Sequence, residues 1–201
     1  MKTVAVSQRV MPMKKPRERR DGLDRRWVSF LERCGFVPIL IPNDVRTARK
    51  ILKAARCQAV LLTGGNDLAP YGGDALERDA TERYLLRHAL KNKMPVLGVC
   101  RGMQMIQDFY GIKLRRFDGH VAAKQIIRVH NKKETVNSYH HFGSRVTLSP
   151  LETWAVALDG VVKAIRCPAK KLCGVMWHPE RFRPFRKKDL RWVRKFFNGG
   201  G

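Results

Sequence analysis

Short apolar runs alternate with longer amphipathic stretches through the first half of the chain. The apolar runs predict strands at residues 3–7, 36–41, 59–62 and 96–99. The stretches between them predict helices at residues 23–34, 45–56, 79–92 and 102–110. Strands that alternate with helices are typical of βαβ units, which build a mainly parallel sheet.

The pattern changes after residue 110. Shorter strands are predicted at residues 125–129, 135–136, 154–158, 161–165 and 172–177, followed by a final helix at 187–197. We therefore expect an α/β fold with three α/β/α layers and a mainly parallel, open, flavodoxin-like sheet, with a small antiparallel extension in the second half. The sequence has no internal repeat and no long linker, so residues 1–201 are expected to form a single domain.

Composition is that of a folded protein without a membrane segment. Hydrophobic residues make up 44% of the chain, which excludes a largely disordered polypeptide. No stretch approaches the roughly 18 apolar residues that span a bilayer, and the first apolar run is too short for a signal peptide. The five cysteines contain no CxxC pair, which argues against a disulfide framework or a structural zinc site. We expect a cytoplasmic location.

The charge balance is strongly basic. Lys and Arg number 41 against 17 Asp and Glu, a formal net charge of +24. The excess is greatest at residues 14–26, 113–133 and 181–195. Such a charge attracts anionic ligands but says nothing about the fold. Two explanations stay open: a generally basic surface, or a cleft that binds a phosphate-bearing substrate.

One of the five cysteines has the sequence context of a nucleophile. In Gly98-Val99-Cys100-Arg101-Gly102 a cysteine stands between two glycines, after an apolar strand and before a predicted helix. This is the layout of a nucleophile elbow, a strained turn in which backbone segments approach too closely for a Cβ. A helix N-terminus favours thiolate over thiol. The other four cysteines are expected to be small buried hydrophobic residues.

A candidate base lies near the end of the chain. In Trp177-His178-Pro179-Glu180 the histidine follows an apolar strand, so it should lie at a strand's carboxyl end, where sites in open α/β sheets assemble. Glu180 could accept a hydrogen bond from the imidazole and fix its tautomer, as the third member of a triad does. His-x-Glu is a weak signal by itself and gains strength from the elbow at Cys100.

Four motifs together carry a family resemblance: Gly-Gly-Asn-Asp at 64–67, Cys-Arg-Gly-Met-Gln at 100–104, Asn-Ser-Tyr-His-His at 137–141 and Trp-His-Pro-Glu at 177–180. In this order they resemble the class I glutamine amidotransferase-like superfamily, and within it the γ-glutamyl hydrolase branch, peptidase family C26. The resemblance implies a cysteine-dependent hydrolase that cleaves a γ-glutamyl amide and releases glutamate. Cys100 would be the nucleophile, His178 the base and Glu180 its orienting partner.

The same resemblance implies the rest of the site. The oxyanion hole would use the backbone N–H groups of Gly65 and Arg101. Contacts to the glutamyl group would come from a set of residues on two segments: Gln104, Asn137, Ser138, Tyr139 and His140. No cofactor and no metal is expected, because adjacent histidines such as His140 and His141 point to opposite sides of a strand.

The first fifty residues look most like a compact subgroup that contains γ-glutamyl-CDP-amidate hydrolase, an enzyme of capsule polysaccharide modification. That likeness implies an anionic small-molecule substrate such as γ-glutamyl-CDP-amidate. Candidate phosphate contacts are arginines that follow the first strand: Arg17, Arg19, Arg20, Arg25 and Arg26. Solvated arginines on a loop and a helix face are an equally open explanation. Phe142 follows the histidines where many relatives have Gln or Gly, which leaves the leaving-group pocket undefined.

Two other functions stay open at this point. The chain could be the glutaminase component of a glutamine amidotransferase, which delivers ammonia to a partner synthetase. It could also be a basic nucleic-acid-binding domain on a former hydrolase fold, although the complete Cys, His and Glu set argues against this. No membrane partner is expected, and the sequence leaves homo-oligomer formation open.

Overall fold

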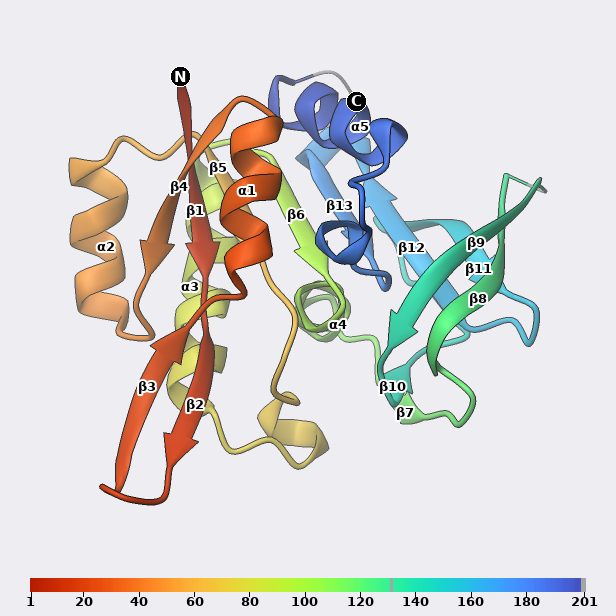
Figure 1. Cartoon of the computed structure of the whole chain (residues 1–201), viewed down its shortest axis with the longest axis horizontal. Helices are drawn as coiled ribbons and strands as arrows, with labels where there is room; N and C mark the ends of the chain where they lie inside the picture. The colour runs from red at the N-terminus through yellow and green to blue at the C-terminus, as the bar shows by residue number, and fades with distance from the viewer. Residues whose placement is uncertain (131, 200–201) are drawn as a thin grey trace.

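The computed structural model describes residues 1–130 and 132–199, and within them nine strands form one mixed sheet (Figure 1). Its order is β4-β1-β5-β6-β13-β12-β11-β8-β9. The parallel part comprises β1 (Lys2–Ser7), β4 (Phe36–Ile41), β5 (Ala59–Leu62), β6 (Val96–Val99) and β13 (Leu172–Val175). The antiparallel part comprises β8 (Val121–Val129), β9 (Lys132–Tyr139), β11 (Glu152–Ala157) and β12 (Val162–Cys167).

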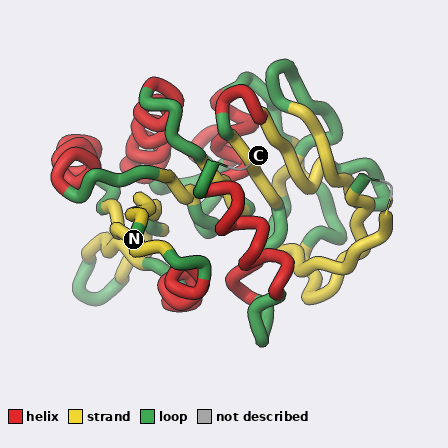
Figure 2. Tube along the Cα trace, turned by 90° about the horizontal axis from the view of Figure 1, so that it is seen from above, coloured by secondary structure: helices red, strands yellow, loops and turns green. Residues whose placement is uncertain are grey.

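Helices cover both faces of the sheet and bury two separate hydrophobic cores (Figure 2). Helices α1 (Arg25–Arg33) and α5 (Lys187–Phe197) pack on one face, through Phe30 and Phe197 among others. Helices α2 (Val45–Ala54), α3 (Leu76–Lys91) and α4 (Arg101–Phe109) pack on the other. Within the described ranges, no helix is both long and apolar enough to cross a membrane.

The predicted fold class is confirmed. The parallel strands have the order β4-β1-β5-β6-β13. This is the flavodoxin-like order, in which the second parallel strand along the chain, here β4, lies at the edge of the sheet. The antiparallel strands extend the sheet from β13, as predicted for the second half of the chain. Strands β5 and β6 have the predicted bounds, because both are apolar on both faces and are bounded by clear turn residues.

A hairpin that the apolar pattern did not predict projects from the first strand (Figure 1). It consists of β2 (Arg9–Met13) and β3 (Glu18–Gly22), and most of its residues are exposed on both faces. Without a buried face, a strand has no apolar alternation to reveal it. The Asn66 side chain anchors the hairpin, accepting a bond from the Val10 N–H (2.9 Å) and donating to the Val10 carbonyl (3.0 Å).

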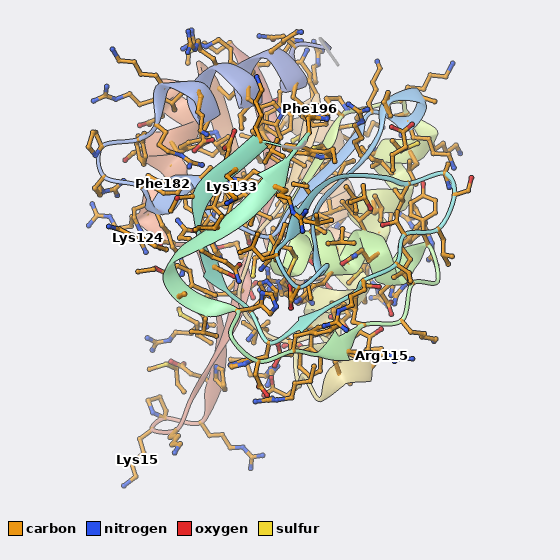
Figure 3. The ribbon with its side chains drawn as sticks, turned by 90° about the vertical axis from the view of Figure 1, so that its right-hand side faces the viewer. Lys15, Arg115, Lys124, Lys133, Phe182 and Phe196 are labelled. Carbon is orange, nitrogen blue, oxygen red and sulfur yellow. The ribbon has the colours of Figure 1, made fainter. Side chains whose placement is uncertain are left out.

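A second hairpin, β8–β9, is longer than the predicted strands at 125–129 and 135–136. Its outer ends carry exposed cations such as Lys124 and Lys133 (Figure 3), where no apolar pattern marks the strand. Short elements complete the chain: β7 (Arg115–Arg116), β10 (Phe142–Gly143), η1 (Ala69–Tyr71), η2 (Pro168–Lys170) and η3 (Pro179–Arg181).

On either side of Cys100, positions 98 in β6 and 102 in α4 have room for glycine only. A Cβ added to Gly98 would lie 2.5 Å from the carbonyl oxygen of Gly102, and one added to Gly102 would overlap the carbonyl oxygen of Leu62. In both cases the obstacle is backbone, which cannot rotate away as a side chain can. The two glycines therefore set how closely α4 approaches the ends of β5 and β6.

We expect Gly102→Ala to lower the free energy of unfolding by about 3 kcal/mol, because the added methyl group must displace the backbone of β5 or of α4. Urea unfolding followed by circular dichroism measures the change. Gly143→Ala is the matched control, since its Cβ would meet side chains and no backbone: a methyl group of Val161 at 3.2 Å, and His140 and Phe117 at ordinary contact distance. Equal losses for the two variants would contradict the packing argument.

Candidate active site

Cys100 lies at the turn between β6 and α4 with a strained backbone. Its φ of 53° and ψ of −107° lie outside the regions that non-glycine residues ordinarily adopt. Such a residue costs about 1–3 kcal/mol and persists only where its surroundings enforce it. Here the Cys100 N–H donates to the Val175 carbonyl (2.7 Å), and its carbonyl accepts from the Gln104 N–H (3.1 Å). The turn holds the thiol at the carboxyl edge of the sheet.

His178 reaches the same edge from the neighbouring strand. Val175 of β13 pairs in parallel with Val99 of β6, so the residues that follow the two strands lie side by side. The Asn137 side chain fixes the histidine backbone, donating to the His178 carbonyl (2.9 Å) and accepting from the His178 N–H (2.7 Å). The ring Nδ1 of His178 lies 2.8 Å from a carboxylate oxygen of Glu180. This contact directs Nε2 away from Glu180.

The thiol and the imidazole border one small space next to Gly64. A Cβ added to Gly64 would lie 3.5 Å from the Cβ of Cys100 and 2.7 Å from Cε1 of His178. Both side chains are buried, and within the described residues Nε2 of His178 has no hydrogen-bond partner that meets normal geometry. Only glycine at position 64 leaves this space open.

Electrostatics favour a thiolate and an imidazolium. Burial acts to raise the pKa of the Cys100 thiol, but the adjacent His178, the Arg101 N–H and the charge of Arg181 together bring this pKa below its ordinary value. Burial acts to lower the pKa of His178, but its interactions with Cys100 and Glu180 raise it to about 9. Each charge stabilises the other, which favours the thiolate–imidazolium pair over the neutral pair.

Two segments next to Cys100, the start of α4 and the Gly64-Gly65 loop, carry backbone N–H groups that could act as donors. Arg101 begins α4, so its N–H has no acceptor within the helix. On the other side, Gly65 adopts a left-handed conformation with φ of 87°. The N–H groups of Gly64 and Gly65 form no hydrogen bond to another residue in the described part of the chain. Free donors on both sides of a nucleophile can stabilise an oxyanion.

The residues expected to contact a glutamyl group lie together on one side of Cys100. The Tyr139 carbonyl is 3.9 Å from the Cys100 sulfur, and the Gln104 amide donates to the Phe142 carbonyl (2.8 Å). The Ser138 hydroxyl donates to the His120 carbonyl (2.7 Å). The Gln104 amide nitrogen and the Ser138 hydroxyl thus have partners within the protein. The Asn137 amide is likewise bonded to the backbone of His178.

A buried lysine that sequence analysis missed joins this group. Lys163 is 1% exposed, and its ammonium lies 3.1 Å from the Ser138 hydroxyl and 2.6 Å from Nε2 of His140. Burial lowers the pKa of Lys163 to about 7. Burial, followed by the charge of Lys163, lowers the pKa of His140 to about 2, so this imidazole is neutral. The one available signal was a lysine inside the apolar run 161–165.

A cleft of about 290 Å³ opens beside His178 on the other side of the Gly64-Gly65 loop. Its charged lining consists of Arg9 and Arg181 together with the carboxylates of Asp24 and Glu180. Arg9 is exposed, lies against Gly65 and forms no ion pair within the described residues. Arg181 stacks over the Tyr139 ring, 4.8 Å from its centroid, and lies 3.6 Å from Glu180. Neither arginine was singled out from the sequence.

The five arginines suggested for phosphate contact lie outside this cleft. Three of them are held in ion pairs: Arg19 with Glu77 at 2.6 Å, Arg20 with Glu18, and Arg26 with Asp24. Arg17 and Arg25 are exposed. The unpredicted β2–β3 hairpin explains the difference, because it turns residues 14–20 away from the sheet edge and brings Arg9 to it.

Metal-binding side chains do not gather in the described part of the chain, where no group of three or more His, Cys, Asp or Glu has suitable geometry. His120 and His140 stack with ring centroids 5.0 Å apart, but His140 bonds to Lys163 and His120 to Asp159 (3.1 Å). All five cysteines are free thiols.

Comparison with known sequences identifies the family of the chain, and comparison with known structures supports its fold. The family model described as Peptidase C26 matches residues 4–117 and 118–180. The γ-glutamyl-CDP-amidate hydrolase of Campylobacter jejuni is 27% identical, with 89% of this chain and 90% of that protein covered. A glutamine-hydrolysing GMP synthase component of Methanoregula boonei is 26% identical, with 71% of this chain and 74% of that protein covered.

A solved structure extends the likeness to the fold. A protein of Thermoplasma acidophilum, suggested to be a component of GMP synthase, superposes with a TM-score of 0.75 at 17% identity. The match covers 100% of this chain and 94% of that one, so it includes both the parallel and the antiparallel parts of the sheet.

We expect His178→Gln to shift the alkylation of Cys100 to higher pH. In the unchanged protein the pKa of Cys100 is lowered, so part of the thiol stays ionised at pH values below the pKa of an ordinary cysteine. Without the imidazolium, burial raises this pKa, so the thiolate forms only at higher pH. Iodoacetamide labelling of the Cys100 peptide across a pH series, read by mass spectrometry, gives the midpoint. His88→Gln, on α3, is the control, and an unchanged midpoint in His178→Gln would refute the charge pairing.

Proposed function

The chain belongs to the Peptidase C26 family of class I glutamine amidotransferase-like proteins, and from this we propose that it cleaves a γ-glutamyl amide bond and releases glutamate. One observation carries the proposal. The buried Cys100 thiol and His178 imidazole border one space next to Gly64, at the N-terminus of α4. This is the arrangement that acyl transfer to a thiol requires.

In the first half of the reaction, the Cys100 thiolate attacks the γ-carbonyl carbon of the substrate. The carbonyl oxygen becomes an oxyanion, which the N–H groups of Arg101 and Gly65 stabilise. When the C–N bond breaks, the protonated His178 gives its Nε2 proton to the departing amine. The products are the free amine and a glutamyl thioester on Cys100.

In the second half, a water molecule replaces the amine. His178, now neutral, takes a proton from the water as its oxygen attacks the thioester carbonyl. The C–S bond breaks, glutamate leaves and the thiolate–imidazolium pair is restored. Glu180 accepts a hydrogen bond from the Nδ1–H group of His178 throughout. This contact keeps Nε2 directed toward the reacting atoms.

The acyl group would lie on the side of Cys100 formed by Gln104, Ser138, Tyr139 and His140. Lys163 supports an acidic acyl group, because its buried ammonium forms no ion pair with a carboxylate in the described part of the chain. The α-carboxylate of a glutamyl group could pair with the Lys163 ammonium and so compensate its buried charge. For Asn137 we propose a role in positioning His178, which its two hydrogen bonds to the His178 backbone support.

The leaving group would occupy the cleft beside His178. The two carboxylates of the cleft already have partners, Asp24 with Arg26 and Glu180 with His178, whereas Arg9 forms no ion pair among the described residues. An anionic amine conjugate fits this chemistry better than a neutral one. We therefore propose a nucleotide phosphoramidate such as γ-glutamyl-CDP-amidate, the substrate in the name of the C. jejuni relative, and cytoplasmic work in capsule or polysaccharide modification.

A second function is favoured by the relationship to a component of GMP synthase. In that case the chain would be a glutaminase that passes ammonia to a partner synthetase. The two functions differ in what the isolated chain does. A hydrolase releases glutamate from its conjugate without a partner, whereas a glutaminase of this kind acts on free glutamine and depends on its synthetase.

Incubation with a panel of γ-glutamyl conjugates, including a cytidine diphosphoramidate, should release glutamate measurable by mass spectrometry. We expect Cys100→Ser to lower this release by about 10⁴-fold or more, since serine at this position lacks the thiolate. Circular dichroism checks that the variant is folded. Retained turnover in Cys100→Ser, or hydrolysis of glutamine alone and only with a synthetase present, would overturn the proposal.

Charge reversal in the cleft tests the leaving group. We expect Arg9→Glu to raise KM for a nucleotide conjugate by about 30-fold, because a charge-assisted contact becomes a repulsion. KM for an uncharged γ-glutamyl amide should change little. Lys53→Glu makes the same change in net charge near the end of α2, at the opposite edge of the sheet, and is the control. Equal effects of Arg9→Glu on both substrates would exclude an anionic leaving group.

A further inference from the structure

A fully buried arginine on α3 holds the backbone of the loop that follows β5. Arg78 is 0% exposed and donates to the carbonyl oxygens of Thr63 (2.8 Å), Gly64 (3.1 Å) and Gly65. It also donates to the side chain of Asn66 (3.1 Å). Burial lowers the pKa of Arg78 to about 10, which leaves it protonated at neutral pH. One guanidinium therefore binds three consecutive carbonyl groups.

These contacts determine where the loop's N–H groups point. In a trans peptide the carbonyl and the following N–H lie on opposite sides of the chain. Since the Thr63 and Gly64 carbonyls face Arg78, the N–H groups of Gly64 and Gly65 face the other way. That side of the loop contains Cys100 and His178, as the approach of Gly64 to both shows. Rotation of either peptide would break a bond to Arg78.

A single carboxylate links Arg78 to the second set of donors. Glu82, also 0% exposed, accepts from Nε of Arg78 (2.9 Å) through one oxygen and from the Arg101 guanidinium through the other. Arg101 bonds to Asp79 as well. The Ser7 hydroxyl donates to Glu82 (2.7 Å). Residues of α3 therefore reach the Gly64-Gly65 loop through Arg78 and the turn after Cys100 through Arg101.

We propose that Arg78 is a positioning residue for the oxyanion hole, and that Glu82 fixes the two halves of the hole relative to each other. Neither side chain touches the substrate. The role rests on the acyl-transfer chemistry proposed above, but not on the identity of the acyl group. Arginine is required because its planar fork can donate to several acceptors at once, whereas a lysine ammonium at the same place would reach fewer of them.

The test compares two reactions of the same thiol. Acylation of Cys100 by p-nitrophenyl acetate passes through an oxyanion, so it needs the aligned N–H groups. Alkylation by iodoacetamide is a displacement at a saturated carbon and needs only the thiolate. Both are followed as modification of the Cys100 peptide by mass spectrometry, with nitrophenolate release as a second readout.

In Arg78→Lys we expect acylation to slow by about 100-fold, the effect of losing one oxyanion donor. Alkylation should stay within about twofold, because the Cys100–His178 pair is unchanged. Arg83→Lys, which alters the Arg83–Asp108 ion pair on the same helix, is the control and should leave both rates unchanged. If the two rates fall together, or if neither falls, Arg78 has no role in positioning the oxyanion hole.

The thiol-reactivity assay tests the role of Arg78 independently of the proposed γ-glutamyl hydrolase function. The acetate ester carries no glutamyl group, so inactivity toward γ-glutamyl conjugates would count against the proposed function alone. Should Arg78→Lys fail to fold, Thr63→Val takes its place. It keeps the side-chain shape and removes the hydroxyl that accepts from Arg78 (3.2 Å), and we expect acylation to slow by about tenfold with alkylation unchanged.

Discussion

The parallel pairing of β6 with β13 is the interaction on which the site depends. Val99 lies opposite Val175, so the turn that presents Cys100 and the loop that presents His178 leave the sheet side by side. The Cys100 N–H bonds to the Val175 carbonyl, which ties the strained turn directly to the neighbouring strand. A shift in this register would separate the thiol from the imidazole, and the charges that stabilise each other would both become costly buried ions.

Many of the buried charged side chains are connected to one another by hydrogen bonds. Arg78, Glu82 and Arg101 share hydrogen bonds, and His178 is paired with Cys100 and Glu180. Apolar residues of the same volume could stabilise the fold as well as the Arg78 group does, since desolvation offsets most of the attraction in such pairs. What an apolar replacement could not do is bind three carbonyl groups of one loop. The network is therefore explained by the order it imposes on the backbone.

The sequence allowed the fold class and the meeting of Cys100 with His178 to be predicted, because apolar strands and a glycine-flanked turn leave local patterns. It did not reveal the β2–β3 hairpin, whose strands are exposed on both faces. Consequently the sequence pattern did not indicate that Arg9 and Arg181 line the cleft, and the candidate arginines among residues 17–26 lie outside it. Lys163 and Arg78 depend on contacts between segments far apart in the chain, and neither has a local signature beyond a charge in or near an apolar stretch.

The β2–β3 hairpin stands outside the nine-stranded sheet, yet its base forms one wall of the cleft. Its attachments, such as Asn66 to Val10 and Arg19 to Glu77, are hydrogen bonds at its edges, and most of its side chains are exposed. If the proposed function holds, chemistry and selectivity lie on separate parts of the molecule. A hairpin of another length or charge could be grafted between β1 and α1 to alter which amines are accepted, while the thiol and its surroundings keep their structure.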